Sequence, residues 1–183
     1  MDQDAPIFWL TGMSGSGKTT LTNAIVKKLR NEGLNVLILD GDKVRESYET
    51  KLGFNEKDIE KNNLNISHYC SIERKGYDCI IVPIISPFDN VRKKVRNFLS
   101  KGFYLVYLSS TIDSLKIRDP KGLYHKADLG EINNLIGYSE ILRYDIPNDY
   151  DLIIDTSNSI DKSDSISLFY NFINQKILDS EVT

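Results

Sequence analysis

The feature that most constrains this chain is a phosphate-binding loop placed between an apolar run and a helix-forming stretch. Residues 12–19 read GMSGSGKT, a complete match to the pattern G-x-x-x-x-G-K-[ST]. Residues 7–10 before the loop predict a strand, and residues 20–30 after it predict a helix. The glycines let backbone N–H groups close around phosphate oxygens, and the positive end of the following helix strengthens that attraction. An ordinary glycine-rich turn is the alternative, which these flanking elements argue against. We therefore expect the chain to bind a nucleoside triphosphate, with Lys18 reaching its β- and γ-phosphates and the Thr19 hydroxyl holding Mg²⁺.

Short apolar runs alternate with longer amphipathic stretches along the chain. Runs that are apolar throughout are typical of strands buried on both faces of a parallel sheet. The alternation predicts a three-layer, doubly wound α/β fold of about five parallel strands, like that of nucleotide kinases, with its ligand site at the carboxyl ends of the strands. The expected strands cover residues 7–10, 36–39, 79–85, 103–108 and 152–154, and the expected helices cover residues 18–32, 56–75, 90–101 and 164–178.

Residues 118–151 break this alternation. They contain no clear strand, and their polar residues are mixed with glycines. An unpatterned segment of this length in a compact domain is usually functional or disordered. In a phosphate-transferring enzyme it would serve as a lid that excludes water from the nucleotides. We expect a single domain over residues 1–183, with this lid at residues 118–150.

Composition gives no sign of a nucleic-acid or membrane protein. The 183 residues carry a net charge of −3, which gives no electrostatic reason to expect DNA or RNA as a partner. The basic run 92–94 is expected to be a solvated helix face. The acidic N-terminus lacks the apolar core of a signal peptide, and no apolar run approaches the roughly 20 residues that span a bilayer. We expect a cytoplasmic protein with no membrane partner, in which Cys70 and Cys79 are free thiols and form no zinc site.

Two carboxylates follow the second expected strand, in the sequence Asp40-Gly41-Asp42. At the carboxyl end of a strand they would face the γ-phosphate. One of them could order Mg²⁺, and the other could accept a proton from a substrate hydroxyl. An acidic turn is the alternative, because Asp-Gly is common in turns. Arg45, a few positions later, is a candidate contact for a substrate phosphate.

Two cations open the unpatterned segment, in the run RDPKG at residues 118–122. Arg118 and Lys121 on a mobile segment would neutralise the charge of a transferring phosphate. A surface cation is the alternative for each, and for Lys121 taken alone it is the better one. His68 and His125 have no serine or carboxylate pattern that would indicate nucleophilic catalysis, so we expect both to be structural.

Together these pieces resemble the adenylylsulfate kinases (APS kinases), a family of phosphate-loop kinases. The likeness runs from about residue 7 to residue 156. The combination is more specific than any one motif and favours a small-molecule kinase over a GTPase or a motor. The stretches that carry it are FWLTGMSGSGKTTL (8–21), LDGDKVR (39–45), LGF (52–54), ISPF (85–88), RDPKGLY (118–124) and GEI (130–132).

The resemblance implies an ATP-dependent kinase that uses Mg²⁺ and phosphorylates the ribose 3′-hydroxyl of a small-molecule nucleotide, adenylyl sulfate. It implies that Lys18, Asp42 and Lys121 are catalytic, that Asp42 is the base, and that Arg118 lies against the ATP base. Ser86 matches a serine that the family can carry as phosphoserine, and no obligatory covalent step is assigned to it. The implied ATP site comprises Gly12, Ser14, Gly15, Ser16, Gly17, Lys18, Thr19, Thr20 and Arg118; the implied acceptor site comprises Asp42, Arg45, Phe54, Asn62, Ile85, Ser86, Lys121 and Leu135; the implied metal ligands are Thr19 and Asp40.

Several departures from the family pattern fall in the acceptor half. The family reads Asp-Arg-x-Glu-Asn followed by Arg-Arg, whereas residues 58–62 read DIEKN and the later arginines are absent. An acceptor-binding arginine of the family is thus replaced by Ile59, and a stacking aromatic is replaced by Leu135. The asparagine that ends the family's Asp-Gly-Asp-Asn is replaced by Lys43. Losing one such contact and one stacking ring removes on the order of a few kcal/mol of recognition. The ATP half is intact and the acceptor half is altered.

The sequence leaves the acceptor open. Adenylyl sulfate, in sulfate assimilation, is the leading candidate. A related nucleotide with a modified phosphate, such as cytidine diphosphoramidate in capsule biosynthesis, is the alternative. A nucleotide-binding module without catalysis is a third, against which the intact Lys18, Thr19 and Asp42 argue. The oligomeric state is also open, with a homodimer among the options.

Overall fold

The five strands lie parallel in one sheet of order β2-β3-β1-β4-β5. The structure is a computed structural model that describes residues 4–48, 52–158 and 160–181. Strand β1 sits at the centre, where Ile7 lies opposite Ile80 of β3 on one side and Phe103 of β4 on the other. The expected α/β class with a doubly wound parallel sheet is confirmed. The strands are β1 (Ile7–Thr11), β2 (Val36–Ile38), β3 (Cys79–Pro83), β4 (Phe103–Ser109) and β5 (Leu152–Asp155).

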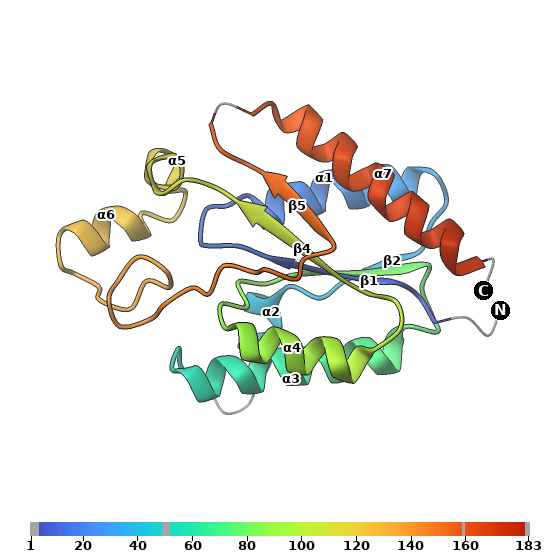
Figure 1. Cartoon of the computed structure of the whole chain (residues 1–183), viewed down its shortest axis with the longest axis horizontal. Helices are drawn as coiled ribbons and strands as arrows, with labels where there is room; N and C mark the ends of the chain where they lie inside the picture. Colours follow the sequence, from blue (N-terminus) through green and yellow to red (C-terminus); the bar gives the residue numbers. More distant parts are fainter. Residues whose placement is uncertain (1–3, 49–51, 159, 182–183) are drawn as a thin grey trace.

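Helices cover both faces of this sheet (Figure 1). One face carries α1 (Lys18–Asn31) and α7 (Lys162–Glu181). The other carries α2 (Gly41–Glu46), α3 (Glu56–Glu73) and α4 (Asp89–Leu99). Two short helices, α5 (Ile112–Arg118) and α6 (Leu123–Asp128), project past the edge of the sheet where the strands end.

Strand β1 shows why the central strands read as continuous apolar runs. Phe8 and Leu10 pack in the hydrophobic cluster under α1 and α7, whereas Ile7 and Trp9 pack in the cluster under α3 and α4. All four side chains are fully buried. Because successive side chains point to opposite faces, a strand covered on both sides needs an apolar residue at every position.

The segment that lacks a sequence pattern is only partly helical. Among its described residues there is no strand, as expected, but α6 and the end of α5 lie within it. Helix α2 was also not expected, because Asp40-Gly41-Asp42 reads as a turn. The structure shows instead that Asp40 caps this helix.

The basic run on α4 is only partly a solvated face. Lys93 and Lys94 are exposed, whereas Arg92 is fully buried. Its guanidinium donates to the backbone oxygens of Ser86 at 2.9 Å and Asp145 at 2.7 Å, so it joins α4 to two loops. The expectation of a solvated face is therefore wrong for Arg92, because buried carbonyls provide it with hydrogen-bond acceptors.

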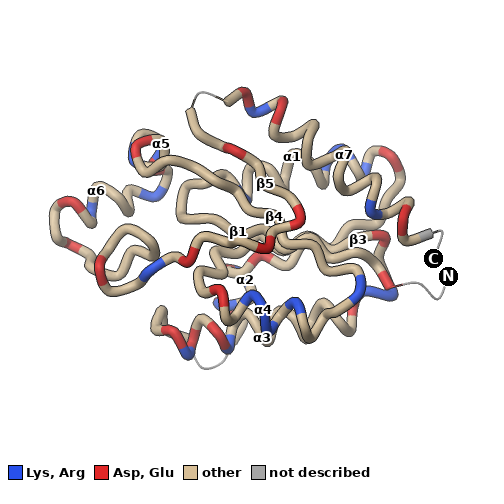
Figure 2. Tube along the Cα trace, in the orientation of Figure 1, with Lys and Arg blue, Asp and Glu red and all other residues tan. Residues whose placement is uncertain are grey.

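The charge distribution, the cysteines and the helix lengths can be compared with the expectations from composition. Figure 2 shows acidic and basic positions interspersed along the helices. Cys70 and Cys79 are free and buried, and burial raises the pKa of each thiol to about 12. Within the described ranges, every helix is too short or too polar to cross a membrane.

Candidate active site

The loop between β1 and α1 has the backbone shape that anion binding requires. Gly15 and Gly17 adopt φ values of +75° and +90°, a left-handed conformation that residues with a side chain disfavour. A hydrogen bond of 3.2 Å from Ser16 N to Met13 O closes the turn. Helix α1 then begins at Lys18 with no side-chain cap. The free N–H groups of its first turn are available to phosphate oxygens.

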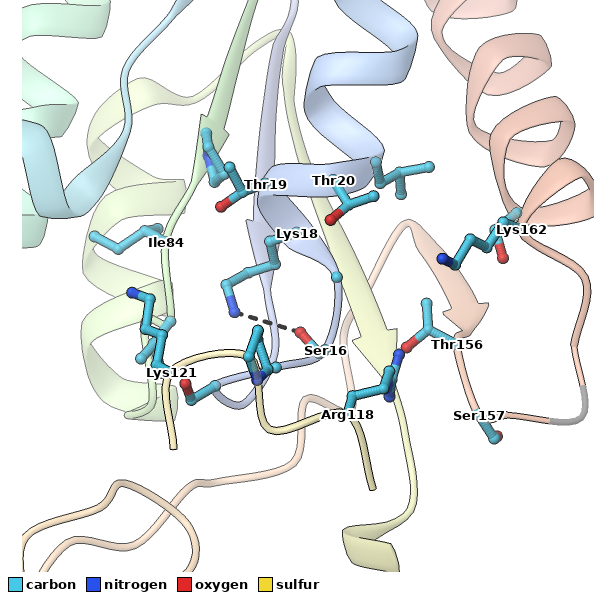
Figure 3. Close-up of a pocket in the computed structure, with 18 of the residues that line it drawn as sticks. Ser16, Lys18, Thr19, Thr20, Ile84, Arg118, Lys121, Thr156, Ser157 and Lys162 are labelled. Carbon is cyan, nitrogen blue, oxygen red and sulfur yellow. Dashed lines mark hydrogen bonds between the residues drawn. The ribbon is translucent and has the colours of Figure 1, made fainter. Parts of the chain in front are cut away.

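Lys18 folds back into this loop. Its ammonium donates to Gly12 O at 2.8 Å, Met13 O at 2.9 Å and Ser16 Oγ at 3.3 Å, the last of which is drawn in Figure 3. Burial lowers the pKa of Lys18 to about 7, and the negative charge of Asp42 acts in the opposite direction. The ammonium is thus held where phosphate charge would meet it, at a cost in desolvation that a bound phosphate would offset.

A cavity of about 630 Å³ opens over the phosphate loop. Its walls come from the phosphate loop, the end of β3, the connection between α5 and α6, and the connection between β5 and α7 (Figure 3). The structure therefore brings together residues that lie far apart in the sequence. The expected site residues that line the cavity are Ser14, Gly15, Ser16, Gly17, Lys18, Thr19, Thr20, Asp40, Asp42, Ile85, Arg118 and Lys121.

Asp40 and Gly41 set the start of α2 at the cavity wall. The Asp40 carboxylate accepts the backbone N–H groups of Asp42 at 3.0 Å and Lys43 at 3.4 Å, which satisfies the first turn of the helix. A side chain at Gly41 would place its Cβ 2.7 Å from Ile84 Cγ1, so only glycine allows this approach. The helix start consequently presents Asp42 to the cavity.

Asp42 is paired with Lys121 across the cavity mouth. Lys121 Nζ lies 3.1 Å from Asp42 Oδ2. Both side chains are mostly exposed. The pair combines a carboxylate that can accept a proton with a cation that can neutralise phosphate charge, and both groups stay accessible to substrates.

Arg118 lies on the opposite side of the cavity from this pair. Its guanidinium is held by Ser114 O at 3.1 Å and Ser110 Oγ at 2.6 Å. In Figure 3 it faces Thr156 of the connection between β5 and α7. In Figure 3 the guanidinium lies on the side of the cavity toward Thr156 and away from Lys121.

Other expected site residues lie outside the cavity lining. Arg45 stacks over the Phe54 ring, with its guanidinium carbon 4.8 Å from the ring centroid, and donates to Gly53 O. Asn62 is buried and donates to Gly41 O at 3.5 Å, while its side-chain oxygen has no hydrogen-bond partner among the described residues. Ser86 is buried at φ +43°, and within the part of the chain that the structure describes its hydroxyl has no hydrogen-bond partner. Gly12 is also outside the cavity lining, and its carbonyl oxygen accepts a hydrogen bond from the Lys18 ammonium.

The two apolar replacements in the acceptor half are both core residues. Ile59 is 2% exposed and packs with Phe88, Val91 and Ile136. Leu135 is 6% exposed and packs with Leu115 and Tyr124 instead of lining the cavity. In this structure neither side chain offers a surface to a ligand in the cavity.

Sequence reasoning missed one wall of the cavity. The connection between β5 and α7, together with the start of α7, contributes side chains that carry hydroxyl, amide and ammonium groups. No local motif marks these residues. Their position just after the fifth strand, at the carboxyl edge of the sheet, is the signal that could have found them. The residues are Thr156, Ser157, Asn158, Ile160, Lys162, Ser165 and Ile166.

The oxygen donors at this site suit a magnesium ion. Among the described residues there is no group of three or more histidine, cysteine or carboxylate side chains that would form an all-protein metal site. The Thr19 hydroxyl and the Asp40 carboxylate both line the cavity. Mg²⁺ is usually held by one or two such ligands together with phosphate oxygens and water, so this donor set fits it.

Comparisons with known proteins agree with this geometry. The family model "Adenylylsulphate kinase" matches residues 4–155. The chain is 36% identical to a probable adenylyl-sulfate kinase of Bacillus subtilis (strain 168) over 172 residues, which cover 93% of this chain and 86% of that protein. It is 34% identical to the adenylyl-sulfate kinase of Clostridium kluyveri, over 86% of this chain and 78% of that protein. Among solved structures, the Mycobacterium tuberculosis APS kinase CysC in complex with AMPPNP and APS superposes with a TM-score of 0.81 at 29% identity, covering 97% of this chain and 99% of that one.

Proposed function

The chain belongs to the adenylylsulfate kinase family of ATP-dependent phosphotransferases, and from this premise we propose that it transfers the γ-phosphate of ATP to the ribose 3′-hydroxyl of adenylyl sulfate. The observation that carries the proposal is the shared cavity. It is lined by the phosphate loop, Asp42 and Lys121, so a donor phosphate, a proton acceptor and a neutralising cation meet there.

Each residue has a role in this transfer. The N–H groups of the loop and the first turn of α1 hold the β- and γ-phosphates, and Lys18 neutralises their charge. Asp42 takes the proton of the 3′-hydroxyl as that oxygen bonds to the γ-phosphorus. The bond from the γ-phosphorus to the bridging oxygen of ADP breaks, and ADP leaves. Lys121 is released from Asp42 to neutralise the charge of the transferring group.

Mg²⁺ would be held by the Thr19 hydroxyl and the Asp40 carboxylate, and it would neutralise phosphate charge there. At the other end of the cavity, Arg118 and the β5–α7 connection would enclose the ATP base. The segment of residues 118–150 would act as the lid, because it carries both Arg118 and Lys121 to the cavity.

Adenylyl sulfate is favoured as the acceptor by the relatives, which are named for that activity. The buried positions of Ile59 and Leu135 keep these substitutions away from the cavity lining. Arg45, Phe54 and Asn62 lie in and around α2 and α3, beside Asp42. We propose that these three residues form the acceptor side of the site, where an acceptor would present its hydroxyl to Asp42.

The test is an acceptor screen with the purified protein, MgATP and either adenylyl sulfate or cytidine diphosphoramidate. The expected result is ATP-dependent formation of the 3′-phosphorylated product from adenylyl sulfate, with a higher kcat/KM than for the cytidine compound. Lys18→Ala should nearly abolish the reaction, because phosphate charge then remains unpaired. A preference for the cytidine compound would overturn the proposed acceptor while leaving the kinase assignment intact.

A further inference from the structure

A tyrosine of the lid segment touches the backbone of the phosphate loop. Tyr124, on α6, donates its hydroxyl to the Ser14 carbonyl oxygen at 2.8 Å. Tyr124 is 1% exposed. The contact is long-range, because 110 positions separate the two residues in the chain. A buried hydroxyl aimed at a loop carbonyl fixes the orientation of that carbonyl.

Fixing the Ser14 carbonyl also fixes the N–H of Gly15. The two groups belong to the same peptide unit, which is planar and trans, so they point in opposite directions. When the carbonyl is held toward Tyr124, the Gly15 N–H points away from the tyrosine hydroxyl, and both Ser14 and Gly15 line the cavity. Gly15, at φ +75°, has the backbone freedom to flip this peptide unless something holds it.

Residues of the phosphate loop next to Ser14 also contact the region of α5 and α6. A Cβ on Gly15 would lie 3.8 Å from both Leu115 and the Pro120 ring. Met13 packs in the hydrophobic cluster that contains Tyr124 and Leu115. One face of the loop is therefore shaped by the α5–α6 region, and the hydroxyl of Tyr124 is a directional contact within that face.

We propose that Tyr124 is a positioning residue for phosphate binding: it holds the Ser14–Gly15 peptide so that the Gly15 N–H faces the phosphates, and it links the phosphate loop to the lid segment. Burial raises the pKa of Tyr124 to about 12, so its hydroxyl remains a donor over the pH range in which kinases are assayed. The inference rests on the proposed ATP site and is independent of which acceptor is used.

Tyr124→Phe removes the hydroxyl and keeps the ring. Tyr138→Phe is the matched control, because its ring packs on Tyr124 at a centroid distance of 5.2 Å while its hydroxyl contacts Lys116 and Asp128 instead of the loop. Calorimetric titration with MgATP should give a Kd raised by roughly 3- to 10-fold in Tyr124→Phe, as expected for one lost hydrogen bond. Tyr138→Phe should bind MgATP as the wild type does.

The steady-state readout separates positioning from general loosening of the fold. In Tyr124→Phe the KM for ATP should rise and that for the acceptor should stay unchanged, with a melting temperature close to that of Tyr138→Phe. An unchanged Kd for MgATP, or an equal loss in both variants, would overturn the inference. A wild type that fails to bind MgATP would instead overturn the proposed function, so the two failures are distinguishable.

Discussion

Lys121 Nζ lies 3.1 Å from Asp42 Oδ2, although 79 positions separate the two residues in the chain. The contact joins the lid segment to the start of α2 at the mouth of the cavity. The side chains are 63% and 67% exposed, and an ion pair in such surroundings adds at most about 1 kcal/mol to stability. Either charge can therefore be removed without unfolding the protein, so activity and stability can be measured separately.

Removing the proposed base should slow the chemical step. Asp42→Asn keeps the shape of the side chain but lowers its capacity to take a proton, so we expect kcat to fall by roughly 100-fold or more while MgATP binding is largely retained. Single-turnover kinetics with adenylyl sulfate would measure this. Glu46→Gln, on the same helix but outside the cavity lining, is the matched control and should keep the wild-type rate. An unaltered rate in Asp42→Asn would remove this carboxylate from the mechanism.

Removing the partner cation should weaken the stabilisation of the transferring phosphate. We expect Lys121→Met to lower kcat by roughly 10- to 1,000-fold, because one charged donor to a developing charge is lost. The melting temperature should stay close to that of the wild type, since the side chain is mostly exposed. Lys126→Met removes an exposed lysine from the same segment and should have little effect. Equal activities in the two variants would make Lys121 an ordinary surface cation.

The sequence predicted the sheet well because the signals that define it are local. Every expected strand is present, since a strand buried on both faces must be apolar at each position, as Phe8 and Trp9 illustrate. The short helix α2 was missed because its first residues also form a good turn. The close approach of Gly41 to Ile84, which follows strand β3, favours the helix over the turn, and this contact depends on the fold.

The site was predicted only where a motif spans adjacent residues. The phosphate loop carries its own pattern, and Asp42 follows a strand. By contrast, Thr156 in the β5–α7 connection and Lys162 at the start of α7 reach the cavity only because these elements follow the fifth strand. The family pattern matches Ile59 to a ligand-binding arginine, but a match in sequence does not show where the side chain points. In the structure this side chain points into a hydrophobic cluster.

That burial changes what restoring the family's arginine should do. The sequence alone predicts that Ile59→Arg improves kcat/KM for adenylyl sulfate if that nucleotide is the acceptor, and that it helps little or is harmful if the acceptor is a different nucleotide. In the structure it would place a guanidinium among Phe88, Val91 and Ile136. We expect a loss of several kcal/mol in the free energy of unfolding, because a buried charge without a partner is costly.

Chemical denaturation would measure this loss. Ile72→Arg is the matched control, since Ile72 lies on the same helix and is 71% exposed, and it should leave stability nearly unchanged. A stable Ile59→Arg variant with improved kcat/KM would show that α3 can present this position to the acceptor after all.

The last prediction concerns the proton on Lys18. Burial lowers the pKa of its ammonium to about 7 in the free protein. Phosphate charge favours the protonated form, so the pKa must be higher when ATP is bound. Above the free pKa, binding must therefore take up a proton, and affinity should fall as the pH rises from neutrality toward the bound pKa. Below the free pKa, Lys18 is already charged and binding should be insensitive to this group.

Calorimetry at about pH 8, in two buffers of different ionisation enthalpy, should reveal uptake of close to one proton, and at about pH 6 almost none. Lys18→Arg supplies the control, because a guanidinium stays protonated throughout and should abolish the uptake. Identical binding heats for the wild type in both buffers at the higher pH would mean that the ammonium remains charged inside the loop, held by the carbonyls of Gly12 and Met13.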